Sequence, residues 1–470
     1  MSEGEVPTYA ALSYCWGDDQ PMKTTNATLK ERESGIPLSK LPKILQDAIE
    51  ITRRIKLQYI WVDSICIIPD DHSDVQKELS AMARIYMEAF VTISAANASC
   101  IDEGFLPKRN LPKAYISLYK LGYRCPDGQL GSILLSEGTI NNERTEPLDL
   151  RAWTLQEQKL SPRILRFGTK QLEFECAKMQ RVDGGHDSPP EVGVTEDPYY
   201  FDGSPHKQRA KDKSSTGGTA RNWRFIVEQY TGRGLKFPSD RLPAIAAIAE
   251  QFAPYLETDY LAGLWKSDLQ FELCWRKENT QEQDAPLSTY VRLPPSWSWA
   301  SIVGKVKFTY QSELRTAALE IVDCEIKLKS ELVPYEAVES GRLTVKGRIQ
   351  RVLWTGACLI DPSVGDEGTI VTDETFPDTI ENLASNLAAS LSVWCLEVTT
   401  VRHRERNCPS GIILMLENSI FKRVGYFEIP VELSAWERLH NKNIKRSGIV
   451  QPSLQADWFC HCKSQSITIV

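Results

Sequence analysis

Residues 59–68 read YIWVDSICII, and this stretch decides the predicted fold of the N-terminal part of the chain. It is an almost uninterrupted apolar run of strand length, which is typical of a strand covered on both faces of a parallel sheet. Residues 10–14 and residues 90–95 are further runs of this kind. Stretches with helical periodicity separate the three runs, at residues 41–52 and 73–86. This alternation of strands and helices predicts a doubly wound α/β domain with right-handed crossovers.

Local signals indicate where the helices begin and end. Ser73 and Gln76 have the spacing of a capping box at the start of the second helix. A third helix is predicted for residues 149–160, DLRAWTLQEQKL, with Asp149 as its N-cap and Ser161, before a proline, at its end. The apolar stretches that follow this helix, around residues 164–175, predict a hairpin.

The third helix carries a carboxylate where an apolar residue is expected. Trp153, Glu157 and Leu160 are spaced i, i+4 and i+7, which places them on one face of the helix. A glutamate between a tryptophan and a leucine loses solvent, and this desolvation raises its pKa unless a cation or donor stabilises the charge. Two interpretations stay open: Glu157 performs chemistry, or it forms a structural ion pair with one of three nearby arginines, Arg151, Arg163 and Arg166.

The remainder of the chain has a different composition. Residues 181–220 are rich in Gly, Pro, Ser and charge, which predicts a flexible insertion. Helical periodicity then resumes, and strand-like patterns dominate after residue 294, with an acidic, loop-like stretch at residues 361–386. The predicted organisation is an N-terminal domain at 1–180, the insertion at 181–220, a helical segment at 221–285 and a β-rich region at 286–470.

Bulk properties exclude several classes of protein. A net charge of -7 over 470 residues argues against a nucleic-acid binder. No apolar run is long enough for a membrane span, the first residues lack the features of a signal peptide, and the cysteines stand singly in apolar runs. We therefore expect a cytoplasmic protein. No Walker loop, G-x-S-x-G elbow or dinucleotide fingerprint is present, and Cys460-His461-Cys462 lacks a second ligand pair, so no metal site is predicted.

Three stretches resemble the signature blocks of a known family. They are YAALSYCWG at residues 9–17, WVDSICI at 61–67 and RAWTLQE at 151–157, and they occur in the family's order. Together they resemble the fungal heterokaryon incompatibility (HET) domain, over roughly residues 9–176. Two departures from the family pattern are Ile68-Pro69, where Asn-Gln is usual, and the small number of residues before the first block.

The resemblance implies a function in fungal non-self recognition that ends in growth arrest or programmed cell death, with protein partners of the incompatibility system. The HET domain is similar to the Toll/interleukin-receptor (TIR) domain, a flavodoxin-like parallel sheet with flanking helices. Some TIR proteins cleave NAD with a glutamate in a Trp-Cys-x-x-Glu block. Trp153 and Glu157 have the same spacing. This analogy makes Glu157 the candidate catalytic residue of an NAD glycohydrolase and NAD the candidate substrate, with no other cofactor expected.

Six residues are candidates for binding this substrate: Trp16, Gly17, Asp18, Asp63, Arg151 and Trp153. Trp16 offers a stacking face and Gly17 permits a positive φ, although such a turn can also merely close over the core. Asp63 would face the crevice at the end of a parallel strand, or else accept hydrogen bonds from loop amides. Arg151 could clamp a phosphate or pair with Glu157.

Two further hypotheses remain beside the enzyme. The domain could be a non-catalytic interaction module that forms homo-oligomers, or a degenerate member that has lost activity. A pocket shared by Glu157, Asp63 and Trp16 would favour ligand chemistry. A Glu157 locked against arginines without a cavity would favour a structural role.

Overall fold

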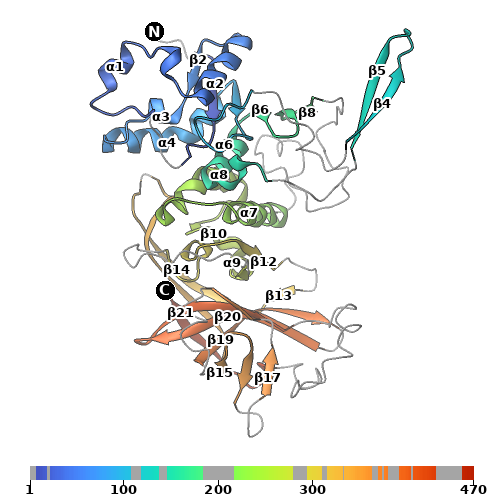
Figure 1. Cartoon of the computed structure of the whole chain (residues 1–470). Helices are drawn as coiled ribbons and strands as arrows, with labels where there is room; N and C mark the ends of the chain where they lie inside the picture. The colour runs from blue at the N-terminus through green and yellow to red at the C-terminus, as the bar shows by residue number, and fades with distance from the viewer. Residues whose placement is uncertain are drawn as a thin grey trace. The chain divides into compact units, whose positions relative to one another are not determined.

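The computed structural model describes the chain at residues 7–17, 22–106, 118–136, 145–183, 216–278, 294–309, 315–331, 333–362, 369–372, 375–378, 391–403, 406–429 and 458–470. It divides into two compact units, Met1–Lys211 and Asp212–Val470, which are labelled by element in Figure 1. No helix in these described ranges is long and apolar enough to cross a membrane.

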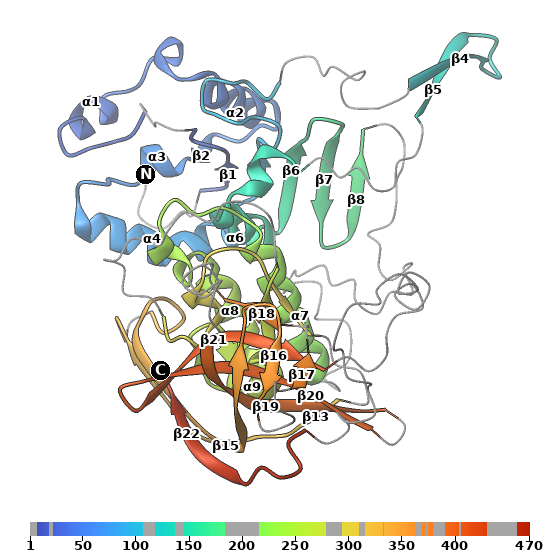
Figure 2. The same ribbon diagram turned by 60° about the horizontal axis from the view of Figure 1, so that its bottom comes forward.

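The first unit is built on a mixed sheet with the strand order β2-β1-β3-β6-β7-β8. Its strands are β1 (Tyr9–Ser13), β2 (Tyr59–Trp61), β3 (Val91–Ser94), β6 (Arg163–Phe167), β7 (Leu172–Cys176) and β8 (Met179–Val182). The first four strands in this order are parallel, and β7 is antiparallel to its two neighbours, β6 and β8. Figure 2 shows these last three side by side at one end of the sheet. The prediction of an α/β region with parallel strands is confirmed.

The order of the parallel strands reverses at β1. From β1 the chain first forms β2 on one side and then crosses to β3 on the other side. In open α/β sheets, ligands bind outside the carboxyl ends of the strands at such a reversal. Ser13 is the last residue of β1 and Ser94 is the last residue of β3. The carboxyl ends of these two strands therefore mark the place to look for a site.

The two faces of this sheet have different chemistry. The longer helices of the unit are α2 (Lys43–Arg54), α4 (His72–Glu88) and α6 (Ala152–Leu160); the shorter elements are α1 (Leu29–Glu33), η1 (Leu38–Lys40), α3 (Asp63–Cys66), η2 (Pro147–Leu150) and a separate hairpin, β4 (Leu118–Arg124) with β5 (Leu130–Ser136). Alternate residues of β1, Ala10 and Leu12, pack in an apolar core with Ile44 and Leu45 of α2. The intervening residues of β1 point to the opposite face, where Ser13 lies in the pocket described below with side chains of α6.

Side-chain contacts with the backbone change three of the predicted boundaries. The stretch YIWVDSICII is a strand only as far as Trp61, because Asp63 begins the helical turn α3 and its Oδ1 accepts the Ser64 amide at 2.6 Å. Helix α4 is capped by Asp71, not by Ser73, since Asp71 accepts the amides at its first turn.

Asp149 is also not the N-cap of the third helix. It lies in η2, where its carboxylate accepts a hydrogen bond from the Arg166 guanidinium. Arg151 is the N-cap residue of α6, and its side chain makes no capping hydrogen bond. The predicted end of this helix at Ser161 is confirmed, because Ser161 is its C-cap.

The second unit is rich in β-structure, as predicted. Two helices, α7 (Thr216–Thr231) and α8 (Pro243–Leu256), come first, followed by short elements: η4 (Pro238–Asp240), β9 (Tyr260–Leu261), β10 (Leu264–Trp265), η5 (Lys266–Asp268), α9 (Leu269–Glu272), β11 (Trp275–Lys277), η6 (Trp299–Ser301) and β12 (Val306–Phe308). A large sheet contains β13 (Arg315–Ala317), β14 (Glu320–Leu328), β15 (Val338–Trp354), β16 (Leu359–Asp361), β17 (Thr369–Thr372), β18 (Thr375–Pro377), β19 (Leu391–His403), β20 (Arg406–Glu417), β21 (Ile420–Glu428) and β22 (Ser464–Ile469).

The acidic stretch at residues 361–386 is not all loop. Strands β17 and β18 lie within it and pair with β16 and β21. The predicted insertion falls mostly outside the described residues.

A buried arginine organises the core of the second unit. The Arg423 guanidinium pairs with Asp378 at 3.0 Å, and its Cζ lies 3.3 Å from the centroid of the Trp275 ring. It also donates to the Leu273 and Trp275 carbonyls. A buried charge is tolerated when its donors all find acceptors, so this network stabilises the packing of β11 on β21.

Candidate functional site

The three signature stretches converge on one buried carboxylate. We call the following residues the Glu157 cluster: Ser13 at the end of β1, Asp63 after β2, Tyr86 on α4, Arg151 at the N-cap of α6 and Glu157 on α6. They come from segments far apart in the sequence. The parallel strands bring them to the same place, because α4 and α6 both pack beside β1.

Glu157 is buried, with 7% of its surface exposed. Burial raises its pKa to about 7, and the charge of Asp63 acts in the same direction. The hydroxyl of Ser13, the charge of Arg151 and the hydroxyl of Tyr86 oppose this increase. The carboxyl therefore exchanges between its neutral and charged forms near neutral pH, which is the range that a functional acid or base requires.

Tyr86 has one hydroxyl hydrogen and two candidate acceptors. In the structure, that hydroxyl donates to the Leu12 carbonyl at 3.1 Å, and the same oxygen faces Glu157. The hydrogen can serve only one acceptor at a time. With the hydrogen on Leu12, Ser13 is the donor for charged Glu157, and the Tyr86 hydroxyl stabilises that charged form only when its hydrogen turns to Glu157.

Asp63 is held by several donors. Its Oδ2 accepts Trp16 Nε1 at 2.9 Å, and its Oδ1 accepts the Ser64 amide at 2.6 Å. Burial raises its pKa, and hydrogen bonds from Tyr14, Ser64 and Trp16 oppose the shift. The amide that Asp63 accepts belongs to Ser64, the next residue of α3. Asp63 also fixes the edge of the Trp16 ring.

Arg151 connects the first and third signature stretches. Its guanidinium donates to the Tyr14 carbonyl at 3.1 Å, and its Cζ lies 5.9 Å from the centroid of the Trp16 ring. Its charge favours the ionised forms of Glu157 and Asp63. Trp16, Asp63 and Arg151, three of the predicted binding residues, therefore lie together.

The other two arginines proposed as partners of Glu157 are engaged elsewhere. Arg166 binds both oxygens of Asp149, at 3.2 and 2.6 Å. Arg163 donates to the Phe90 carbonyl and lies over the Phe90 ring. Of the three arginines, only Arg151 therefore acts on Glu157, and it acts through its charge. The groups that hydrogen-bond Glu157 are the hydroxyls of Ser13 and Tyr86.

The remaining predicted binding residues are Gly17, Trp153 and Asp18. Gly17 has φ +80, and a Cβ added there would lie 2.8 Å from Cys100 Cβ, so this turn requires glycine. Trp153 is half-buried on α6, one turn before Glu157. Asp18 lies outside the described residues.

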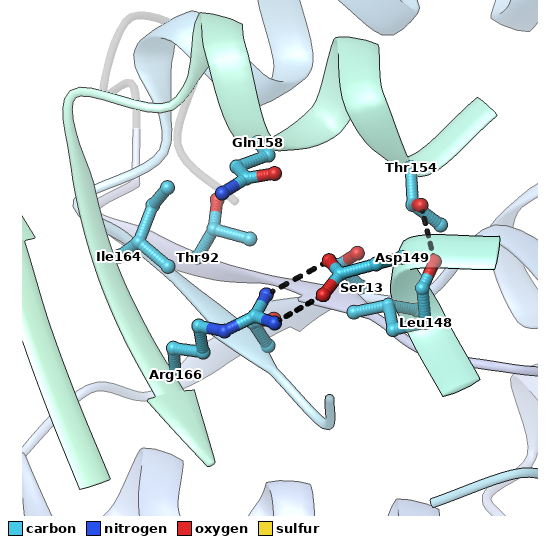
Figure 3. Close-up of a pocket in the computed structure, with 9 residues that line it drawn as sticks. Ser13, Thr92, Leu148, Asp149, Thr154, Gln158, Ile164 and Arg166 are labelled. Atoms are coloured by element: carbon cyan, nitrogen blue, oxygen red, sulfur yellow. Dashed lines mark hydrogen bonds and ion pairs between the residues drawn. The ribbon is translucent and has the colours of Figure 1, made fainter. Parts of the chain in front are cut away.

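A small polar pocket adjoins the cluster between α6 and the sheet (Figure 3). Its walls are Ser13, Thr92, Ser94, Leu148, Asp149, Thr154, Gln158, Ile164 and Arg166. It has room for about one water molecule. Its nine lining residues include Ser13 but not Glu157, Asp63 or Trp16. This pocket is therefore not one that Glu157, Asp63 and Trp16 share.

Sequence reasoning missed two members of the cluster as functional candidates. Ser13 lies in the first signature stretch, and Tyr86 lies on the helix between the second and third. Neither residue is among the candidate site residues predicted from the sequence. Their position within or between family blocks was the available signal.

Comparisons with known proteins agree with the signature stretches. Residues 9–157 match the family model described as heterokaryon incompatibility protein (HET). The chain is also similar to the vegetative incompatibility protein HET-E-1 of Podospora anserina, with 28% identity over 90 residues. That alignment covers 19% of this chain and 6% of the relative. No solved structure matches the chain.

Proposed function

The chain is a heterokaryon incompatibility (HET) domain protein, and from that premise we propose that it acts in fungal non-self recognition, with the HET domain as its effector. In this proposal, activation of the domain arrests or kills the fused cell. The second unit holds the domain inactive or senses a protein partner. The name of the similar protein and the matched family support the role in incompatibility.

We further propose that the effector step is cleavage of NAD at the bond between nicotinamide and ribose. The observation that carries this proposal is Glu157, a buried carboxyl with a pKa of about 7, beside the carboxyl end of β1 where the strand order reverses. The parallel order β2-β1-β3-β6 supports the likeness to TIR-type, flavodoxin-like domains. That likeness is an analogy of fold and spacing.

The chemistry requires one carboxylate. Nicotinamide leaves as a neutral molecule with the electron pair of the C–N bond, so no general acid is needed. Charged Glu157 would stabilise the oxocarbenium-like ribose that remains. Water then adds to the anomeric carbon and releases one proton, giving ADP-ribose. Arg151 and Trp16 lie where they could contact a phosphate and an aromatic ring, after the segment around α6 opens to admit the dinucleotide.

A direct assay tests the enzymatic proposal. Purified full-length protein is incubated with NAD, and free nicotinamide is measured across pH. We expect release to increase with pH through about 7, as Glu157 loses its proton. Glu157→Gln should lower the rate about 100-fold or more. Glu88→Gln, at the exposed end of α4, is the matched control and should leave the rate unchanged.

A second arm separates the enzyme from an interaction module. Wild type and Glu157→Gln are expressed in a fungal host, and growth is followed. Growth arrest by wild type that disappears in Glu157→Gln supports the enzyme. Equal arrest by both, without loss of NAD, would instead assign the domain to signalling by self-association.

A further inference from the structure

The pocket under α6 has the size and chemistry of a water site. Seven of its nine lining side chains are polar: Ser13, Thr92, Ser94, Asp149, Thr154, Gln158 and Arg166. A buried water needs a space of about 10–15 Å³ and typically makes about three hydrogen bonds. The pocket meets both conditions, since it has room for one water and more than enough polar groups on its walls.

The hydrogen bonds around the pocket leave the Thr92 hydroxyl oxygen able to accept a further hydrogen bond. Ser161 Oγ donates to the Glu157 carbonyl at 2.6 Å and therefore has no hydrogen for a second acceptor. In its 2.6 Å contact with Thr92 Oγ1, Ser161 must be the acceptor and Thr92 the donor. The Thr92 oxygen keeps lone pairs for a donor inside the pocket, and water is a donor of the right size.

Ser13 belongs to both the pocket and the Glu157 cluster. Its hydroxyl lines the pocket and also hydrogen-bonds to Glu157. The alternative hydroxyl, that of Tyr86, is 1% exposed and donates to the Leu12 carbonyl, so it does not lead to solvent. Asp149 and Arg166 also line the pocket, and their side chains are partly exposed.

We propose that the pocket binds one water molecule, and that this water and the Ser13 hydroxyl form the path along which Glu157 exchanges protons with solvent. The purpose of the path rests on the proposed function, because a carboxylate that must be charged during NAD cleavage has to release its proton. The proton moves from Glu157 to Ser13 Oγ, the Ser13 hydrogen moves to the water, and the water passes a proton outward. No bond to carbon changes in these steps, and no electron is transferred.

The charged and titratable groups around Glu157 come from three elements and the segment after β1. Asp63 on α3 and Arg151 at the cap of α6 act on Glu157 by charge, Tyr86 on α4 faces it, and Cys15 lies beyond the end of β1. These groups set the protonation equilibrium of Glu157. The water and Ser13 set the rate, so variants of the path should change the rate of exchange more than the equilibrium.

The first test is structural. A crystal structure of the full chain should show one ordered oxygen within hydrogen-bond distance of Ser13 and Thr92. A pocket that is collapsed, or that lacks density for a water at a resolution where neighbouring waters are ordered, would overturn the proposal.

The second test measures proton exchange at Glu157. After a rapid pH jump, infrared spectroscopy follows the band of the neutral carboxyl, which is assigned by its loss in Glu157→Gln. Ser94→Val fills the pocket with a methyl group, and Ser94→Ala is the control that keeps the space open. We expect Ser94→Val and Ser13→Ala to slow the exchange about tenfold, which corresponds to the loss of one hydrogen bond in the path.

Rescue distinguishes the path from a change in packing. Ser13→Thr retains the hydroxyl and should restore the exchange rate that Ser13→Ala loses. Equal rates in all folded variants, or slowing by Tyr86→Phe instead, would overturn the path. Neither test uses NAD, so a protein that shows the water and the rates but does not cleave NAD would retain this site and lose the proposed function.

Discussion

Replacing Glu157 by glutamine should stabilise the protein at alkaline pH. The folded domain holds this carboxyl at a pKa of about 7, against an ordinary value of 4.5. Between those two values the folded state binds more protons than the unfolded state, so its stability decreases as pH rises from about 4.5 to about 7. At about 1.4 kcal/mol per pKa unit, ionisation of Glu157 destabilises the fold by about 3 kcal/mol above pH 7. Glutamine has the same shape and no charge.

We therefore expect Glu157→Gln to match wild type near pH 4 and to exceed it by up to about 3 kcal/mol near pH 8. Differential scanning calorimetry of the full chain at both pH values measures this. Asp47→Asn is the contrasting control, because the buried Asp47 carboxylate accepts the Phe105 and Leu106 amides and pairs with Lys43. It should destabilise the protein by about 1–3 kcal/mol. A Glu157→Gln variant that is less stable than wild type by the same margin at pH 4 and pH 8 would refute the reasoning and make Glu157 a structural residue.

Three further predictions concern the framework of the two units. Arg166→Met leaves the Asp149 carboxylate unpaired at a partly buried position and should reduce the free energy of unfolding by about 1–3 kcal/mol; an unchanged melting temperature would contradict this. Gly17→Ala combines a positive φ with a contact to Cys100, and it should lower the melting temperature more than Gly128→Ala, which has a similar φ but open space around it. Arg423→Met strands the buried Asp378 carboxylate and should destabilise the second unit by about 3–5 kcal/mol, measured as loss of its calorimetric transition; a normal transition would show that the pair is dispensable.

Hydrophobic patterning predicted the elements that apolar burial determines. Residues 10–14 and 90–95 became β1 and β3, because a strand covered on both faces requires a continuous apolar run. The pattern failed where one polar side chain competes for the backbone. Asp63 takes the amide of Ser64 and turns the chain into α3, so the apolar residues after it never join the sheet.

In the site, too, the spacing of residues within one helix could be predicted, and the contacts between different elements could not. The spacing of Trp153, Glu157 and Leu160 within one helix was enough to predict a buried acid, and burial of Glu157 is confirmed. The choice of partners was not local. Arg166 reaches Asp149 because β6 directs it toward η2, and this contact removes both an N-cap and a candidate partner of Glu157 that proximity in sequence had suggested.

The parallel arrangement of β1, β3 and β6 also governs when the site comes into existence. A hairpin can close as soon as its second strand leaves the ribosome, whereas parallel neighbours must wait for the long connections between them. Ser13 is synthesised early, Glu157 follows β1, β2 and β3, and β6 follows Glu157, so a nascent chain that ends before Glu157 carries no assembled carboxyl site. For a domain whose proposed action harms the cell that makes it, such assembly keeps translation products that end before Glu157 inert.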